Sequence, residues 1–223
     1  MKNTSLRFFQ PIISGAQFSD RWRACLGAML GVAFTILTGQ LFSYNDTLPA
    51  IAAPLGASAV LAFAVPASPL AQPWPILGGN IFSALVGVTI YKLVPDSLLA
   101  ATLAVGAAIF VMSLLRCLHP PGGAMALSMV ISGKAIHQAG YAFAILPVGI
   151  NCIALLIAAH IYHRFSGHSY PHKASPLTPS GLHMTDIDAA LEDMHESFDI
   201  SREDLDALLT RAEHHAAQRL RKN

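Results

Sequence analysis

Charged residues are scarce through the middle of this sequence. Among the 140 residues from Ala24 to His163 the only acidic or basic ones, histidine aside, are Lys92, Arg116, Lys134, Asp46 and Asp96. Over the whole chain 12% of residues are charged and 53% are hydrophobic, whereas a soluble domain carries about 25% charged residues. Ten of the 13 acidic residues lie from Asp186 onward. This distribution predicts a membrane domain followed by a polar tail, and the net charge of +1 gives no indication of nucleic-acid binding.

Cysteine and catalytic motifs are scarce as well. Cys25, Cys117 and Cys152 all stand in apolar sequence without the CxxC or Cys/His spacing of zinc sites, so we expect small buried hydrophobic residues, no metal and no cofactor. No Ser/His/Asp set, HExxH motif or P-loop is visible. We therefore expect no enzyme. The alternative is a membrane enzyme with His119 as base and Arg116 binding a phosphate, but the membrane region offers no carboxylate partner.

Long apolar runs, by contrast, are abundant. A spanning helix needs about 20 apolar residues, and four runs come close to or exceed this length: 24–42, 76–94, 97–115 and 141–163. Two shorter apolar pieces, 50–65 and 121–132, are bracketed by proline and glycine. We predict an all-α polytopic membrane protein with four long transmembrane helices and two short Pro/Gly-bracketed helical segments.

The two halves of the apolar region resemble each other. "PLGASA" (54–59) aligns with "PGGAMA" (121–126), and "GGNIFSALVGVTIY" (78–91) aligns with "GINCIALLIAAHIY" (149–162). This pattern predicts an internal two-fold repeat. If the short segments cross the membrane, each half has three crossings and the repeats are inverted. If they re-enter, each half has two crossings and the repeats are parallel. Interrupted segments at matching places in two halves are typical of a transporter binding site.

Basic residues flank the apolar region at both ends. Lys2, Arg7, Arg21 and Arg23 precede the first helix, while Arg164 and Lys173 follow the last. Cytoplasmic loops carry an excess of Lys and Arg, so we expect both termini in the cytoplasm and an even number of crossings. No signal peptide is evident, because the first apolar run has no small-residue cleavage site. We expect an integral protein of the bacterial inner membrane.

The predicted organisation has four parts. A cytoplasmic N-terminal segment covers 1–23, the transmembrane domain 24–165, a Pro/Ser-rich linker 166–184 and a short cytoplasmic helical tail 185–223. Within the tail, residues 186–198 predict one helix, and Ser201 can cap the next. The apolar stripe of that second helix fits either a small appendage or a dimer contact, so a homo-oligomer remains an alternative.

The stretch "LLRCLHPPGGAMAL" (114–127) interrupts the apolar sequence with residues that helix interiors and lipid avoid. Pro121 suits the first position of a helix, and Gly122 and Gly123 would leave the first N–H groups uncovered. A bare helix start attracts anions, and Arg116 and His119 add positive charge. The predicted binding site comprises Arg116, His119, Pro120, Pro121, Gly122 and Gly123, the repeat positions Gly56, Ala57 and Ser58, and the paired Asn80 and Asn151.

Structural interpretations of these residues stay open beside the functional one. The HPPGG segment fits a tight turn between helices, with the Arg116 side chain extending to the interface. Asn80 and Asn151 fit hydrogen bonds between helices as well as they fit a cavity wall. An ionisable residue inside a membrane is nevertheless a functional hypothesis by default.

Two stretches resemble the signatures of the HPP family of integral membrane proteins: "APLGASAVLAFAVPASPLAQPWPILGGN" (53–80) and "LLRCLHPPGGAMAL". The family takes its name from the His-Pro-Pro that His119, Pro120 and Pro121 match, and the resemblance covers about residues 20–165. It implies a four-helix membrane protein and a transporter, with nitrite suggested by plastid and cyanobacterial members. Many bacterial members continue into CBS domains. The tail here resembles their linker, so we expect no nucleotide regulation within this sequence.

The sequence thus predicts a membrane transporter or channel for a small inorganic anion, with nitrite as the family's suggestion, whose partners are that anion and the lipid bilayer. The alternative is a membrane anchor or sensor that acts through its C-terminal helical tail.

Overall fold

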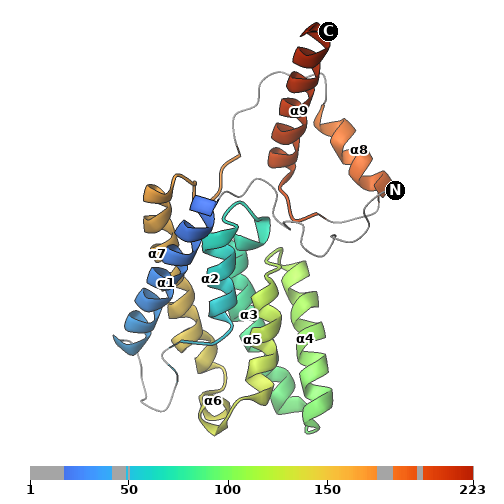
Figure 1. Ribbon diagram of the computed structural model, residues 1–223. Helices are drawn as coiled ribbons and strands as arrows, with labels where there is room; N and C mark the ends of the chain where they lie inside the picture. Colours follow the sequence, from blue (N-terminus) through green and yellow to red (C-terminus); the bar gives the residue numbers. More distant parts are fainter. Residues whose placement is uncertain (1–17, 42–48, 50, 175–182, 195–197, 223) are drawn as a thin grey trace, which may run out of the picture.

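The computed structural model describes residues 18–41, 49, 51–174, 183–194 and 198–222 (Figure 1). The described residues form helices and connecting segments without a strand, which confirms the all-α prediction. Lys2, Arg7 and Asp46 lie outside the described residues, as do most of the predicted segment 1–23 and residues 175–182 of the predicted linker.

Four helical runs in the described chain are long and apolar enough to cross a membrane. They are α1 (Phe18–Leu41), α3 (Pro73–Leu93), α4 (Ser97–Leu114) and a run formed by η3 (Ala144–Gly149) and α7 (Ile150–Ser166). The four predicted spans are confirmed. The last one is broken at Leu146, whose backbone is not helical, because the following Pro147 disfavours a helical residue before it.

The two short apolar segments also form helices. They are α2 (Leu55–Ala64), with ten residues, and α5 (Pro120–Ile131), with 12. At 1.5 Å per residue these helices are about 15 and 18 Å long, whereas the hydrocarbon core is about 30 Å thick. Each short helix is therefore too short to span the hydrocarbon core by itself. A further short helix, α6 (Lys134–Ala139), follows α5.

Helix direction decides between the two predicted repeat arrangements. In Figure 1, α1 and α3 run one way and α2 runs the other, while α4, α5 and α7 each run opposite to their counterparts α1, α2 and α3. The two ends of the bundle are fixed by side-chain contacts. Trp74 at the start of α3 donates to the Leu115 carbonyl after α4, at 3.0 Å, and Lys92 near the end of α3 lies 4.4 Å from the Tyr141 ring centre. The repeats are inverted, with three passes in each half.

Helix packing follows the same symmetry. α1 packs on α2 and α7, and its counterpart α4 packs on α5 and α3. Each first helix therefore contacts the third helix of the other half, so the halves are interlocked. Small residues allow the close approach: α4 turns Ala100, Ala104 and Ala108 toward α3 and α5, and all three are buried.

The tail forms two helices, α8 (Met184–Met194) and α9 (Arg202–Lys222). Both lie beyond the end of the bundle where α1 begins and α7 ends (Figure 1). The predicted cap is confirmed, because the Asp204 N–H donates to Ser201 Oγ at 3.1 Å. The turn η2 (Pro69–Ala71) connects α2 to α3 at the same end of the bundle.

Candidate functional site

The HPPGG stretch forms the break between α4 and α5. Arg116 adopts a positive φ of 52°, which reverses the chain after α4. Pro120 and Pro121 occupy the first two positions of α5, where a helix does not need their missing N–H groups. His119 directly precedes them with an extended backbone (φ −144°, ψ 109°), and its side chain is fully buried.

Both ring nitrogens of His119 have hydrogen-bond partners. Nδ1 lies 2.8 Å from the carbonyl oxygen of Leu70 in η2, and Nε2 lies 2.7 Å from the hydroxyl of Ser58 in α2. A carbonyl only accepts, so Nδ1 carries a proton and donates it. In the neutral ring Nε2 then accepts from Ser58, whose oxygen accepts from the Asn80 amide at 3.1 Å. Three side chains from α3, α2 and the start of α5 thus form one directed chain.

Two fully buried oxygens on one face of α3 have no hydrogen-bond partner within the described residues. They are Asn80 Oδ1 and Ser83 Oγ. The Asn80 amide nitrogen is already used by Ser58 and by the Ile76 carbonyl, at 2.8 Å. An unpaired buried polar atom costs about 1–3 kcal/mol, and such atoms in a native protein call for an explanation such as a bound solute or water. We name Ser58, Asn80, Ser83 and His119 the polar cluster.

Glycines bring α3 and α5 so close together that the polar cluster is shut. A Cβ atom at Gly79 would lie 2.5 Å from the His119 Cβ, and one at Gly122 would lie 2.7 Å from Ser83 Oγ. All four side chains of the cluster are 0% exposed. In this conformation the cluster is closed to the surroundings of the bundle.

Asn151, the repeat counterpart of Asn80, is also fully buried. Its Oδ1 accepts the backbone N–H of Ala52 at 3.2 Å. Ala52 precedes α2 at the position that His119 occupies before α5 in the aligned repeat. Irregular backbone inside a membrane needs an internal partner, and Asn151 supplies one. The sequence left two roles open for Asn80 and Asn151, hydrogen bonding between segments or lining a cavity. Both side chains make hydrogen bonds between segments.

The other residues predicted for the site lie around the polar cluster. The Arg116 side chain is exposed at the end of α4, Pro120 is exposed, Pro121 and Gly122 are buried, Gly123 is half-buried, and Gly56 and Ala57 are exposed in the first turn of α2. Of the predicted set, the structure brings together Ser58, Asn80 and His119, and it places Arg116 apart from them at the bundle end.

The expectation that the first N–H groups of the short helices are uncovered is wrong for three of them. The Gly122 N–H donates to the carbonyl of His119 at 2.8 Å. Gly56 and Ala57 donate to carbonyls of the preceding turn, at 3.1 Å each. The reason is that the turn before each helix folds its carbonyls back onto the first amides. The starts of α2 and α5 would therefore attract an anion through the helix dipole more than through free N–H donors.

Ser83 and the turn η2 were not anticipated from the sequence. Ser83 follows Asn80 by three residues in an apolar helix, a spacing that places both side chains on one face. That spacing was a usable signal. Leu70 contributes only its carbonyl oxygen to His119, and no side-chain pattern reveals such a contact.

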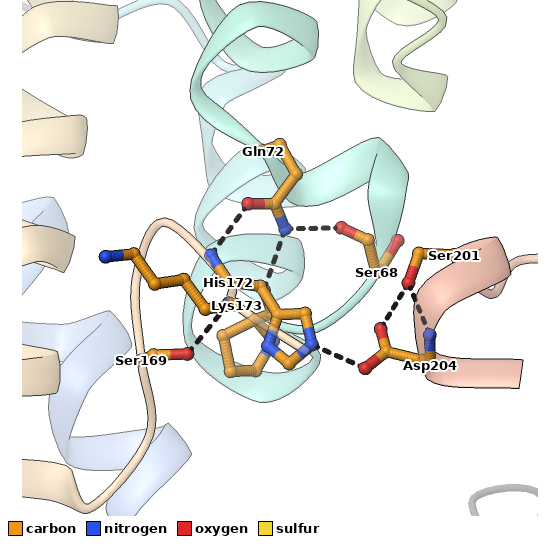
Figure 2. Close-up of polar contacts among 8 residues, drawn as sticks. Ser68, Gln72, Ser169, His172, Lys173, Ser201 and Asp204 are labelled. Carbon is orange, nitrogen blue, oxygen red and sulfur yellow. Dashed lines mark hydrogen bonds and ion pairs between the residues drawn. The ribbon is translucent and has the colours of Figure 1, made fainter. Parts of the chain in front are cut away.

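The turn that holds His119 also receives the tail. Ser68, directly before η2, has its hydroxyl 2.8 and 2.9 Å from the two carboxylate oxygens of Asp199. Gln72, directly after η2, accepts the backbone N–H of His172 at 2.9 Å. Figure 2 shows His172 also reaching α9, where its Nε2 lies 2.9 Å from Asp204 Oδ1. The tail and the linker are thus bonded to the two sides of the turn that supports the polar cluster.

Comparison with known proteins identifies the family of this chain. The model of the HPP transmembrane region matches residues 13–171, which include every membrane pass and the whole polar cluster. This chain belongs to the HPP family. It is an integral membrane protein, as the family match and the apolar helices together require.

Two curated relatives of this HPP protein come from Dictyostelium discoideum, and both are described only as transmembrane proteins. One is 35% identical over 145 residues, covering 61% of this chain and 50% of the relative. The other is 39% identical over 114 residues, covering 49% of this chain and 36% of the relative. The chain therefore spans half or less of the length of these relatives. No solved structure matches the chain.

The three residues that name the HPP family have distinct structural roles in this protein. Pro120 and Pro121 start α5, and Pro121 is buried whereas Pro120 is exposed. His119 joins α5 to α2 and to η2 through its two ring nitrogens. The motif therefore fixes where the second short helix begins and what its start contacts.

Proposed function

We propose that this HPP protein is a transporter or channel for a small inorganic anion, with nitrite as the first candidate, and that it carries out no covalent chemistry. The observation that carries the proposal is the polar cluster, in which the Ser83 hydroxyl, which can donate to an anion, and the Asn80 carbonyl, which needs a donor such as a bound water, are buried without partners among the described residues. A purely structural core has no use for such atoms, because each one destabilises the fold.

The position of the polar cluster supports a transport site. Inverted repeats with interrupted helices hold their substrate where the interrupted segments of the two halves meet. Here Ser58 lies in the first turn of α2 and His119 directly precedes α5, and their 2.7 Å contact joins the two helix starts. The positive ends of both helix dipoles therefore converge on the cluster, which favours an anion. Ser83 adds an O–H donor that no group in the described part of the chain accepts.

The occluded cluster suits an alternating-access mechanism. Gly79 and Gly122 bring α3 into direct contact with the start of α5, so a small displacement of α5 would expose Ser83. Because α1 packs on α2 and α7, whereas α4 packs on α3 and α5, the bundle divides into two groups of helices that can rock against each other around the cluster. Rocking of one repeat against the other is the usual movement in transporters built this way.

Charge at the two ends of the bundle supports an orientation. Arg21, Arg23, Arg116 and Arg164 lie at the end where α1 begins, and Lys92 and Lys134 lie at the other. Cytoplasmic segments carry the excess of basic residues, so we propose that the first end faces the cytoplasm of a bacterial cell. Arg116 then raises the local concentration of anions at the cytoplasmic mouth.

The test is anion flux into liposomes that contain the purified full chain. Nitrite, nitrate, formate and chloride are compared for the wild type, Ser83→Ala and Arg116→Ala. Ser83→Ala removes an unpaired buried hydroxyl, so we expect unchanged or higher stability, by up to about 1–3 kcal/mol, together with slower flux. That combination separates a binding role from misfolding.

Ser113→Ala is the matched control, because the Ser113 hydroxyl is exposed on α4 and bonds only within its helix, to the Ile109 carbonyl at 2.8 Å. It is expected to leave flux unchanged. If well-folded wild type moves none of the four anions, the transport proposal is wrong. If Ser83→Ala and Ser113→Ala transport equally well, the polar cluster is not the site.

The contacts of the tail favour a second candidate, a membrane anchor or sensor with its output in α8 and α9. Ser68 and Gln72 tie Asp199 and His172 to the bundle, so a movement of η2 would be felt by the tail. A variant that lacks residues 184–223 separates the two candidates. A transporter still moves anions without the tail, whereas a sensor loses its output.

A further inference from the structure

An apolar groove runs between α1 and α7 on the outside of the bundle. Its volume is about 330 Å³, and the residues that line it include Gly31, Phe34, Ala158, Ile161, Tyr162 and Phe165. Glycine residues of α1 form part of the floor of the groove, so no side chain fills the groove there and it reaches the α1 backbone. Phe165 and Ile161 are 85% and 54% exposed. The groove therefore opens toward the surroundings of the bundle, which along these two spans are lipid.

Positive charge gathers at one end of this groove. Tyr162, which lines the groove, donates its hydroxyl to the Arg23 carbonyl at 2.7 Å. This bond fixes the start of α1 beside the last turns of α7. Arg23 lies four residues before Gly27, which also lines the groove, so it stands one turn above the groove on the same face of α1. Arg164 lies three residues after Ile161, which also lines the groove, so the two are neighbours on the surface of α7, and the Arg164 side chain is exposed.

The charge at this mouth is only partly neutralised. Asp20 lies 3.7 Å from Arg23 in an exposed contact, and exposed pairs of this kind contribute little. The two arginines at the mouth, Arg23 and Arg164, against Asp20 leave a net charge of +1. Trp22 is 64% exposed in the same turn, as is typical of a side chain at the membrane interface.

We propose that this groove binds an anionic phospholipid, with one acyl chain between α1 and α7 and the phosphate on Arg23 and Arg164. Arginine pairs with phosphate through two parallel hydrogen bonds, and each basic residue near a negatively charged leaflet adds about 1 kcal/mol of attraction. A second copy of the chain is the less suitable occupant. A symmetric contact there would bring the arginines of two mouths together, and like charges at an interface oppose association.

The proposal is tested with the full chain purified in detergent and titrated in native mass spectrometry. The probes are phosphatidylglycerol, phosphatidylcholine with the same acyl chains, and glycerol 3-phosphate, which has the headgroup charge without the chains. We expect phosphatidylglycerol to bind most tightly. Each of Arg23→Gln and Arg164→Gln is expected to weaken its binding about fivefold, as the loss of one charge near the headgroup implies. Arg116→Gln, an arginine at the same bundle end but outside the groove, is expected to leave binding unchanged.

A groove-filling variant separates the acyl-chain site from a simple basic surface. Ala158→Leu narrows the groove and should weaken phosphatidylglycerol binding while Arg23 and Arg164 stay in place. If Ala158→Leu does not elute as a single species, Phe34→Trp is used as the groove-filling variant in its place. Changes at Gly27 or Gly31 are unsuitable, since a Cβ there would lie 2.5 to 2.7 Å from Phe63 or Tyr162. Equal binding of the two lipids, equal binding of glycerol 3-phosphate, or undiminished binding with a filled groove each overturns the proposal.

Discussion

The Nε2 atom of His119 lies 2.7 Å from the hydroxyl oxygen of Ser58, which joins the start of α5 to the first turn of α2. These two helices come from opposite halves of an inverted repeat. The contact is thus a direct link between the halves at the place where both are interrupted. Because the Asn80 amide donates to the same Ser58 oxygen, α3 shares in the link. Whatever opens the polar cluster has to break or rearrange this junction.

Replacing Ser58 by alanine should destabilise the protein. The change leaves Nε2 of the buried His119 without a donor and removes one acceptor of the Asn80 amide, so we expect a loss of about 1–3 kcal/mol. The measurement is thermal unfolding of purified protein in detergent. Ser128→Ala on α5 is the control, since the Ser128 hydroxyl bonds only to Ala124 in its own helix, at 2.7 Å. Equal melting temperatures for the two variants would contradict the His119 contact.

Two glycine-to-alanine changes should have opposite effects. A Cβ at Gly79 would lie 2.5 Å from the His119 Cβ and 2.9 Å from the Cys117 carbonyl oxygen. The carbonyl belongs to the backbone, so relieving this clash would require the main chain to move. Gly79→Ala should therefore destabilise the bundle and push α5 away from α3. A Cβ at Gly106 meets nothing within 4 Å, so Gly106→Ala in α4 should stabilise by about 0.5–1 kcal/mol.

Thermal unfolding of both variants, side by side, checks this prediction. A Gly79→Ala protein as stable as wild type would mean that α3 and α5 are not in close contact at the polar cluster. A destabilised Gly106→Ala protein would mean that the exposed side of α4 is covered by something in the membrane, such as a second chain.

The helices were predictable from the sequence because the bilayer imposes their length. Residues 97–115 contain no charged residue, and α4 occupies Ser97–Leu114. The aligned "PLGASA" and "PGGAMA" predicted the repeat, but residue patterns alone did not decide between crossing and re-entry. That choice depends on how α2 and α5 pack against the long helices, which is a property of the assembled bundle.

The candidate site was predicted less well than the fold. Residue type suggested that Arg116 and His119 act together, but the depth of a side chain depends on the local backbone, and the positive φ of Arg116 turns the chain so that the arginine stays outside while His119 is buried. The main partner of His119 Nδ1 is a backbone carbonyl, at Leu70. A carbonyl is present at every position, so its importance appears only in three dimensions.

The contact between His172 and Asp204 should depend on pH in the acidic range. Burial raises the pKa of the Asp204 carboxyl, but the hydrogen bonds from His172 and Ser201 and the charge of His172 outweigh it and lower the pKa below its ordinary value of 3.8. A lowered carboxyl pKa stabilises the docked tail above the ordinary value, and this stabilisation is lost as the pH falls through the lowered one. From Asp204 we therefore expect weaker docking below about pH 4 than at neutral pH.

Hydrogen exchange in the first turn of α9, corrected for the intrinsic pH dependence of exchange, measures this docking. Asp204→Asn should raise exchange there at neutral pH, whereas Glu213→Gln, an exposed change on the same helix, should not. Unchanged exchange in Asp204→Asn would show that the His172 contact does not hold the tail.

The inverted arrangement predicts which side of the membrane each loop faces. With three passes in each half, Arg116 lies on the same side as Arg164, and Lys92 lies on the opposite side. If α2 and α5 only re-entered, Arg116 and Lys92 would exchange sides, whereas Arg164 would stay where it is.

Single cysteines at these three positions distinguish the two arrangements through labelling by a membrane-impermeant thiol reagent. They are introduced into a chain whose Cys25, Cys117 and Cys152 are replaced by serine or alanine. We expect Arg116→Cys and Arg164→Cys to react only from the cytoplasmic side and Lys92→Cys only from outside, and outside labelling of Arg116→Cys would show that the short helices do not cross.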